Sequence, residues 1–448
     1  MNAVVISVIV MLVLSVARVH VVISLFLAAL VAGLSAHMGV QGTMVAFQDG
    51  LAGGAKIALS YALLGAFAMA VAHSGLPRLL ANRLISKMSA ADETSSERVR
   101  RATKWGLVGG VVAMGVMSQN LIPIHIAFIP LLVPPLLGVM NELRIDRRLI
   151  ATSITFGVVT AYMFLPIGFG RIYLHDILYA NIDKAGMNVE GVNPIVAMGI
   201  PALSMLVGLL LSLFVYSKPR EYRAASGEYA RTTERIEPRK VWAAVIALAT
   251  CFGIQTWLTL IDSEADPLLV GAIVGLCMLL FMRVVPWQQA DDVFSGGMRM
   301  MSLIGLIMIT AQGYASVLNA SGSIEPLVRR TAELFAGSKI LAAFAMLLVG
   351  LVITMGIGSS FSTLPIISAI YVPLCATLGF SPTATVAIIG TAGALGDAGS
   401  PASDSTLGPT TGLNVDGQHD HMRDTVIPTF VHYNIPLLIG GWIAAMVL

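Results

Sequence analysis

The sequence predicts an all-α polytopic membrane protein, and three observations support that class. Of its 448 residues 56% are hydrophobic and only 12% are charged, whereas soluble domains carry about 25% charged residues. Apolar runs recur along the whole chain, which has a mean hydropathy of +0.83. The length allows about ten spans of about 20 residues each. No basic patch interleaved with aromatic residues points to nucleic acid.

Apolar runs predict five spans in each half of the chain. In the first half they cover about 1–17, 20–37, 57–73, 150–180 and 194–216, and in the second about 241–260, 267–282, 298–318, 383–400 and 426–448. The first run has no basic segment before it, and a second apolar run follows at once. It is therefore expected to be a transmembrane helix rather than a cleaved signal peptide.

Two further apolar stretches, 106–139 and 339–377, fit poorly as single spans, and each has a polar break in its middle. Basic clusters at 98–104 and 144–148 flank the first stretch. Because cytoplasmic loops hold the excess of Lys and Arg, this stretch should enter and leave the membrane at the cytoplasmic face, as a re-entrant hairpin. The same reasoning makes 339–377 a hairpin that enters from outside.

A weak internal repeat relates the two halves. Phe47 and Phe294 align with the Ser-Gly pairs at 74–75 and 321–322 at one constant interval. Likewise VMSQNLIPIHIAFIP (116–130) parallels GSSFSTLPIISAIYVP (358–373), and FGVVTAYMFLPIGFG (156–170) parallels GTAGALGDAGSP (390–401). Because an odd number of crossings precedes it, the second copy should be inverted, as in many secondary transporters.

The expected organisation follows from these patterns. A first inverted repeat covers 1–216, with its hairpin at 106–139 and a broken helix at 150–180. A cytoplasmic linker covers 217–240. A second repeat covers 241–448, with its hairpin at 339–377 and a broken helix at 383–405.

Four breaks interrupt these helices, at 118–120, 168–170, 358–363 and 393–404. Non-helical backbone at membrane depth is tolerated only where protein or a water-filled cavity covers it, and the helix ends it exposes attract ions and charged groups. We expect the breaks to meet near the bilayer midplane, although each could also be an ordinary turn or packing feature. The candidate solute-binding residues are Ser118, Gln119, Asn120, Ser359, Ser360, Ser362, Thr363, Thr160 and His125.

Asp397 is the leading candidate for coupling to Na⁺ or H⁺. An ionisable side chain inside a span is costly and usually faces a pathway or a partner, although Asp397 could instead cap the broken helix. Hydroxyl and carbonyl oxygens beside one or two carboxylates suit a hard cation. The surrounding candidates are Asp404, Gly393, Gly396, Ser400, Ser403 and Ser405. No cofactor beyond the coupling ion is expected, because QHDH (418–421) has no second ligand group at metal spacing.

The hairpin and broken-helix arrangement resembles the ion transporter superfamily. GDAGSPASDSTLGPTTGLN (396–414) and PTFVHYNIPLLIGGWIAA (428–445) resemble bacterial proteins of the Na⁺/H⁺ antiporter family, including NhaC-like proteins and YuiF-like proteins provisionally assigned as amino-acid permeases. The resemblance implies a scaffold domain that dimerises and a transport domain that carries both hairpins and moves like an elevator. It also implies a site at 118–120, 359–363 and 393–397. The hairpin tips read SQN and SSFST rather than the SNT of the dicarboxylate branch, which argues against dicarboxylates.

Residues and resemblance together predict a secondary active transporter, coupled to Na⁺ or H⁺, in the lipid bilayer of the bacterial inner membrane. The expected protein is a homodimer that carries a small solute, with an amino acid such as histidine as the leading candidate. A dedicated Na⁺/H⁺ antiporter without an organic substrate is the alternative, because exchange needs only the carboxylates. An ion channel is less favoured, because two opposed hairpins do not form a continuous pore. An enzyme is not expected, since the chain has no GxSxG, HExxH or nucleotide-binding loop.

Overall fold

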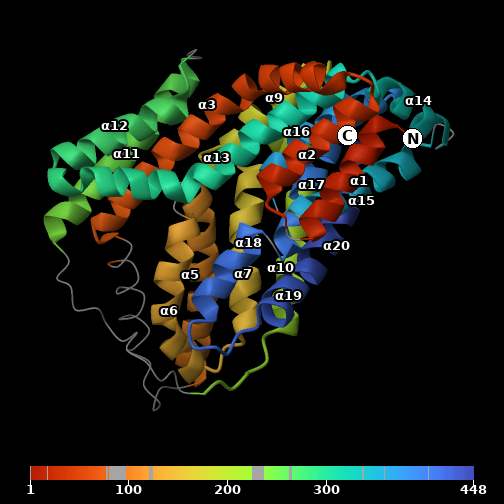
Figure 1. Ribbon diagram of the computed structural model, residues 1–448. Coiled ribbons are helices and arrows are strands. Elements are labelled where there is room, and N and C mark those ends of the chain that lie inside the picture. Colours follow the sequence, from red (N-terminus) through yellow and green to blue (C-terminus); the bar gives the residue numbers. More distant parts are fainter. Residues whose placement is uncertain are drawn as a thin grey trace.

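The computed structural model is helical throughout the residues it describes, which are 2–17, 19–76, 79, 97–120, 125–223, 237–261, 265–334, 338–357, 359–401 and 403–448. No strand occurs in these ranges. The predicted all-α class is therefore confirmed. Figure 1 shows long helices crossing the upper part of the molecule and a bundle of shorter, interrupted helices beside and below them.

The two longest helices, α3 (Gly39–His73) and α13 (Ala290–Ala320), pack along each other. They run in opposite directions, because Gly297 near the start of α13 lies against Ala66 near the end of α3. A β-carbon on Gly297 would collide with the Ala66 backbone, so the missing side chain is what allows the close approach. The pair forms a diagonal ridge in Figure 1.

Both long helices extend well beyond the spans predicted at 57–73 and 298–318. The residues that precede these spans include charged ones, such as Asp49 in α3 and Asp291 in α13. Hydropathy therefore drops although the helix continues. Hydropathy reports the surroundings of a helix rather than its length, so both helices begin before the predicted spans, and the spans themselves stay predictions.

Two pairs of shorter helices flank the ridge in matching ways. Helix α1 (Ala3–Val16) packs on α2 (Val21–Ser35), and α2 packs on α13. In the same way α11 (Pro238–Leu260) packs on α12 (Pro267–Phe281), and α12 packs on α3. Each half of the chain thus places a helix pair against the long helix of the other half.

The ends of the long helices repeat in detail. Ser74 and Ser321 each donate a hydrogen bond to the carbonyl three residues earlier and accept one from the amide two residues later. The glycines that follow, Gly75 and Gly322, both have positive φ, 77° and 62°. The two serines lie 247 positions apart, from 74 to 321.

The same interval recurs where the long helices cross. A β-carbon on Gly305 would lie 3.1 Å from that of Ala58, and these residues are also 247 positions apart, from 58 to 305. Residues related by the repeat therefore meet each other at the crossing. That arrangement is expected where a two-fold axis passes between two antiparallel helices.

Two helical hairpins follow the long helices in the chain. The first consists of α5 (Glu97–Asn120) and α6 (His125–Glu142), and Arg100 donates a 3.5 Å hydrogen bond to the Glu142 carbonyl. The start of α5 and the end of α6 therefore lie together. This hairpin is longer than the predicted 106–139, because α5 continues through the basic residues that precede its apolar run. Its tip, 121–124, lies outside the described residues.

The second hairpin consists of α15 (Lys339–Ile357) and α16 (Ser360–Leu378). Lys339 Nζ donates to the Gly379 carbonyl at 2.5 Å, and Tyr371 donates to the Met346 carbonyl at 2.7 Å. The two helices thus lie side by side with their outer ends together, within the predicted 339–377 apart from one residue. Whether either hairpin re-enters a membrane stays a prediction.

A broken helix follows each hairpin. Helix α7 (Arg147–Phe164) is separated from α8 (Phe169–Arg171) by a break that bends the pair by 53°. After the break, the broken helix continues from α8 through the π-helical η1 (Ile172–Tyr179) and α9 (Ala180–Lys184). Helix α10 (Pro194–Val215) then completes the first half of the chain.

In the second half, α17 (Pro382–Ala394), the short turn η3 (Asp397–Gly399) and α18 (Asp404–Leu413) form the broken helix. The chain then ends in one continuous helical rod, in which π-helical and α-helical segments alternate. The rod comprises η4 (His421–Val426), α19 (Ile427–Thr429), η5 (Phe430–Asn434) and α20 (Ile435–Val447). The remaining described elements are η2 (Trp287–Gln289) and α14 (Ile324–Leu334).

Equivalent residues in the hairpins and broken helices of the two halves are separated by one constant interval in the sequence. Gly115 on α5 packs against Gly157 on α7, and Gly350 on α15 packs against Ala392 on α17. Both contacts recur after 235 positions, from 115 to 350 and from 157 to 392. The N-caps of α7 and α17, Asp146 and Ser381, are separated by the same interval.

This interval corrects one part of the sequence comparison. Residues 118–120 correspond to 353–355 in the structure, and not to the polar residues around 359–363 with which the sequence pattern matched them. The error arose because a polar triplet before a proline is a weak marker. Close glycine contacts between helices identify equivalent positions more reliably.

Three helices in the described ranges are long and apolar enough to cross a membrane, Pro194–Val215, Pro238–Leu258 and His421–Val447. The bent pair of α7 and α8–α9 adds a fourth, and several apolar helices are shorter. Large apolar side chains on α10, including Leu203, Leu210 and Phe214, are exposed, as expected at a lipid-facing surface. The count of ten crossings stays a prediction.

Candidate coupling site

Asp397 is buried between the two arms of the second broken helix, with only 6% of its surface exposed. Three hydroxyl groups donate hydrogen bonds to its carboxylate. Tyr162 and Ser405 donate to Oδ2 at 2.5 and 3.1 Å, and Ser403 donates to Oδ1. Within the described part of the chain no basic side chain forms an ion pair with it. A buried carboxylate with only neutral donors is stable when it binds a proton or a cation.

The backbone of the break positions this carboxylate. Gly396 adopts a positive φ of 87°, and a β-carbon on it would lie 2.8 Å from the Met355 amide nitrogen. Its own amide donates to Asn434 Oδ1 at 2.9 Å. Only glycine fits this turn without strain, so helix α17 ends here and Asp397 is turned inward.

The start of α18 supplies the second wall of the site. Ser403 is the N-cap of α18, where its hydroxyl accepts the Ser405 amide at 3.0 Å while it donates to Asp397. The positive end of a ten-residue helix therefore lies next to the carboxylate. Thr406 donates to the Ser400 carbonyl at 2.5 Å and so holds the loop between them.

The first half of the chain supplies the third wall. The Tyr162 hydroxyl, in the last turn of α7, is 2.7 Å from the Ser360 hydroxyl at the start of α16. Phe361 packs on Tyr162 and Tyr173, with ring centroids 5.4 and 5.5 Å apart. The Asp397 site therefore joins the first broken helix, the second hairpin and the second broken helix, and an aromatic cluster closes one side of it.

Two buried oxygens lie near the first hairpin tip and have no partner in the described part of the chain, Gln119 Oε1 and Thr160 Oγ1. Because Gly115 faces Gly157, the residues one turn further along α5 and α7 lie at the same level. Gln119 and Thr160 therefore lie at about the same level along the paired helices α5 and α7, near the break that follows α7. Unsatisfied buried oxygens of this kind suit water, a cation or a solute donor.

The remaining predicted site residues have varied surroundings. Ser118, Thr363 and Ser400 donate to backbone carbonyls at 2.7, 2.9 and 3.1 Å. Gly393 packs closely on Leu364, and Ser359 is the N-cap of α16. The side chains of Asn120, His125 and Ser362 lie outside the described part of the structure.

Asp404 lies outside the hydroxyl cage of Asp397, the set formed by Tyr162, Ser403 and Ser405. It is the first residue of α18, its side chain is exposed, and no hydrogen bond of the described residues links it to Asp397. Ser405 belongs to the site, as expected of a hydroxyl beside the carboxylate. Tyr162 and Asn434 also belong to it but are absent from the predicted set. A signal for Tyr162 existed: it lies 235 positions before Asp397, at the interval that relates the two halves.

A separate cluster of charges anchors the start of α7 to the loop after α18. Arg147 is fully buried and donates to both carboxylate oxygens of Asp416 at 2.6 Å and to the Leu413 carbonyl at 2.8 Å. Burial alone favours the neutral acid, but the Arg147 hydrogen bonds outweigh it and lower the pKa of Asp416 below its usual value. The cluster fixes the far ends of the two arms that meet at Asp397.

Comparison with known proteins identifies the class. Residues 153–442 match the model of the Na⁺/H⁺ antiporter family, and residues 2–88 match a second model described as Na⁺-H⁺ antiporter family. The chain therefore belongs to the Na⁺/H⁺ antiporter family, and it is a membrane-embedded transporter.

Three relatives align over the whole chain. An uncharacterized membrane protein of Vibrio parahaemolyticus is 49% identical over 100% of both chains, and one of Haemophilus influenzae is 46% identical over 100% of this chain and 99% of its own. YuiF of Bacillus subtilis is 47% identical over 100% of both chains, and its name provisionally assigns it as an amino acid transporter. The resemblance to YuiF-like proteins is thereby confirmed.

Two solved structures share the fold. MtrF of Neisseria gonorrhoeae, described as one of a class of antimetabolite efflux pumps, superposes with a TM-score of 0.59 at 17% identity, over 92% of this chain and 85% of MtrF. YdaH of Alcanivorax borkumensis, described as a transporter, has a TM-score of 0.59 at 16% identity, over 91% of this chain and 88% of YdaH. At these identities the likeness concerns the fold alone.

Proposed function

We propose that this protein is a cation-coupled secondary active transporter in which Asp397 binds Na⁺ or H⁺ and a small solute, an amino acid, moves in the same cycle. The observation that carries the proposal is the buried Asp397 carboxylate, which has hydroxyl donors from two walls and no basic partner in the described residues. Such a group needs a positive charge, and a mobile cation can supply it reversibly.

The hydroxyl cage gives this binding a physical basis. A serine or tyrosine hydroxyl can rotate between donating to a carboxylate and offering its oxygen lone pairs to a cation. With Na⁺ or H⁺ bound, the site becomes neutral and can cross the apolar region at lower cost. Without the cation, the carboxylate keeps its charge and the cost of moving it is high. Movement is thereby coupled to cation binding.

We also propose that the two halves form an inverted repeat and that alternating access is of the elevator type. The repeat is supported by the matched serine caps, by the Ala58–Gly305 crossing and by the common interval of 235 positions in the hairpins. The scaffold would be the ridge of α3 and α13 with its flanking helices, and the moving part would carry both hairpins. A homodimer in the bacterial inner membrane completes the proposal.

The amino-acid assignment is supported by the full-length likeness to YuiF and by the unpaired, uncharged oxygens of Gln119 and Thr160 beside the first break. A dedicated Na⁺/H⁺ antiporter is the second candidate. It is favoured by the family to which the chain belongs and by the fact that the Asp397 cage alone could perform the exchange.

Purified protein in proteoliposomes separates the two candidates. Uptake of labelled amino acids, one at a time, is measured with and without an imposed Na⁺ or pH gradient, while an internal dye reports pH. We expect at least one amino acid to accumulate only when a gradient is present. Gradient-driven pH changes without uptake of any amino acid would leave Na⁺/H⁺ exchange as the function.

A further inference from the structure

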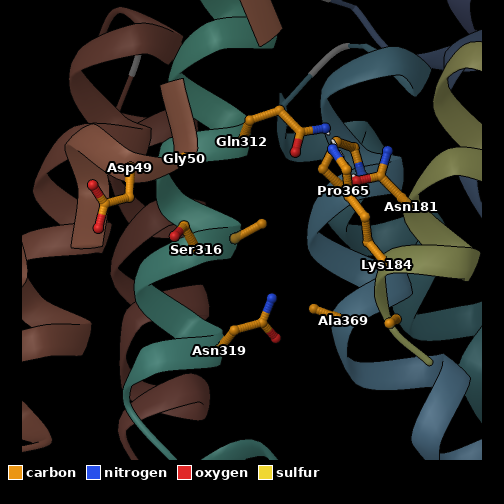
Figure 2. A pocket seen from close by; sticks show the side chains of 11 residues that line it. Asp49, Gly50, Asn181, Lys184, Gln312, Ser316, Asn319, Pro365 and Ala369 are labelled. Carbon is orange, nitrogen blue, oxygen red and sulfur yellow. Dashed lines mark hydrogen bonds between the residues drawn. The ribbon is translucent and has the colours of Figure 1, made fainter. Parts of the chain in front are cut away.

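A polar pocket lies away from Asp397, between the long helices α3 and α13 on one side and helices α9 and α16 on the other (Figure 2). Its volume is about 370 Å³, within the roughly 300–1,000 Å³ of small-molecule sites. The side chains that line it are Asp49, Gly50, Asn181, Lys184, Ala185, Gln312, Ala315, Ser316, Asn319, Pro365 and Ala369.

A buried hydrogen bond between two amides crosses the pocket at one end. Gln312 Nε2 on α13 donates to Asn181 Oδ1 at 3.0 Å, and Asn181 Nδ2 in turn donates to the Ile177 carbonyl at 2.7 Å. Both side chains are buried, at 6% and 5% exposed. This end is therefore an ordered polar wall. In Figure 2 Asn319, also on α13, points from the other end of the pocket toward α16.

The charges of the lining are balanced but unpaired. Asp49 on α3 and Lys184 on α9 have opposite signs and lie on opposite sides of the pocket in Figure 2, and no ion pair among the described residues joins them. The Asp49 carboxylate points away from the centre, so it acts on the pocket through its charge rather than by contact. A pocket with no net charge and separated opposite charges suits a solute that is neutral overall but strongly dipolar.

We propose that this pocket is an access site for a zwitterionic solute, an α-amino acid, on its way to the Asp397 site. Lys184 binds the carboxylate, and the amide oxygens of Gln312 and Asn319 accept hydrogen bonds from the ammonium group on the side nearer Asp49. The inference rests on the proposed function, since it names a second position for the same class of solute.

One helix connects this pocket with the Asp397 site. Pro365 and Ala369 of α16 line the pocket, and Ser360, five residues before Pro365 on α16, bonds to Tyr162 beside Asp397. A solute in the pocket therefore contacts the ridge helix α13 and the hairpin helix α16 at once. When the solute leaves toward Asp397, its simultaneous contact with α13 and α16 is lost, and the part of the molecule that carries the hairpins becomes free to move.

Protection from labelling tests where the solute binds. Ser316 lines the pocket and is half-buried, so we choose Ser316→Cys in a Cys277→Ser background, because Cys277 is the exposed native cysteine while Cys251 and Cys375 are buried. Maleimide labelling of the full-length protein is timed with histidine, glutamine or glycine, and with acetate or methylamine as half-molecules. We expect at least one amino acid to slow labelling several-fold and neither half-molecule to do so. Labelling that no amino acid slows overturns the proposal.

Variants of Lys184 test the contact itself. Lys184→Met should raise the KM for the amino acid about tenfold, the loss expected for one charge-assisted hydrogen bond, and Lys184→Arg should retain most of the affinity. Lys218→Met is the control, because Lys218 is exposed and does not line the pocket, and it should leave the KM for the amino acid unchanged. Uptake with an unchanged KM in Lys184→Met refutes the access site but leaves the proposed function intact. Protection without any uptake by the wild type supports the pocket and refutes amino-acid transport.

Discussion

The two broken helices of this protein have the same architecture and different chemistry. In both, a helix packed on its hairpin ends at a break that contains a glycine with positive φ, Gly168 at 60° and Gly396 at 87°. At equivalent positions the first break contributes Tyr162 and the second contributes Asp397, and the two side chains hydrogen-bond to each other at 2.5 Å. The first break provides a neutral donor and the second provides the charge.

The difference explains how two similar halves of the chain can form a single site, with unlike side chains at related positions. Two identical carboxylates at related positions would repel each other across the axis. One carboxylate and one phenol instead form a charge-assisted hydrogen bond, which is stronger than a neutral one. The far ends of the broken helices differ too: α7 begins at the Arg147–Asp416 ion pair, whereas α17 begins at Ser381, whose hydroxyl donates to the Leu448 carbonyl at 2.9 Å.

Removing the charge from the second break should have the largest effect. Asp397→Asn keeps the size of the side chain but cannot hold a proton or cation by charge, so we expect gradient-driven flux in proteoliposomes to fall to the protein-free background. Asp404→Asn is the matched comparison, because Asp404 is exposed and has no hydrogen bond to Asp397 among the described residues, and its flux should fall much less. Equal loss in both variants would mean that the carboxylates act together.

Breaking the anchor of the first broken helix should cause the largest loss of stability. Asp416→Asn leaves Arg147 buried without its counter-ion, and the expected loss is about 3–5 kcal/mol in the free energy of unfolding. Asp183→Asn, at an exposed residue near the end of α9, should change stability by about 0.5 kcal/mol or less. Denaturant or thermal unfolding in detergent measures both.

The same ion pair makes a prediction for pH. Because the pKa of Asp416 is lower in the folded than in the unfolded protein, its contribution is fully present above the unfolded value of about 3.9 and is lost as pH falls through the folded pKa. The stability gap between the wild type and Asp416→Asn should therefore narrow only below about pH 4. A gap that widens in acid would contradict the assignment of Asp416 as the charged partner.

Alanine at the two glycines compares the breaks directly. Both substitutions force a residue with a β-carbon into positive φ, at a cost of about 1–3 kcal/mol. Gly396→Ala should cost more than this range, because its β-carbon would also meet Met355 and Leu351 backbone atoms at 2.8 and 2.9 Å. Gly199→Ala in α10, where nothing lies within 4 Å, should be neutral or slightly stabilising. The reverse order of the first two would show that the second break is the more adaptable.

Removing the phenol from the first break should have the smallest of these effects on transport. Tyr162→Phe deletes one hydroxyl bonded to Asp397. We expect the apparent affinity to weaken roughly tenfold if Na⁺ is the coupling cation, because a coordinating oxygen is lost, and to strengthen by a similar factor if it is H⁺, because the charged carboxylate loses a stabilising hydrogen bond. Tyr314→Phe removes a similarly buried hydroxyl, bonded to Ser7 at 2.8 Å, and should leave that affinity unchanged. If both variants behave alike, the phenol at the break has only a structural role.

Much of the fold could be predicted from local patterns, with characteristic errors. Apolar runs and low charge led to an all-helical class, and glycine and proline marked the interruptions near Gly168 and Gly396. The starts of α3, α5 and α13 were missed, because helices continue through polar and basic residues that hydropathy treats as loops. Of the predicted coupling residues, Asp397 and Ser403 are hydrogen-bonded to each other, whereas no hydrogen bond of the described residues links Asp404 to Asp397.

The sequence by itself determined that a carboxylate would lie inside an interrupted apolar helix, because hydropathy and helix breakers act over a few neighbouring residues. Only the tertiary structure decided that Tyr162, 235 positions earlier, faces that carboxylate. It also decided that Gln312, Asn181 and Lys184 share a pocket. The physical reason is that such contacts depend on how helices cross and rotate against each other, and those angles depend on packing summed over the whole molecule.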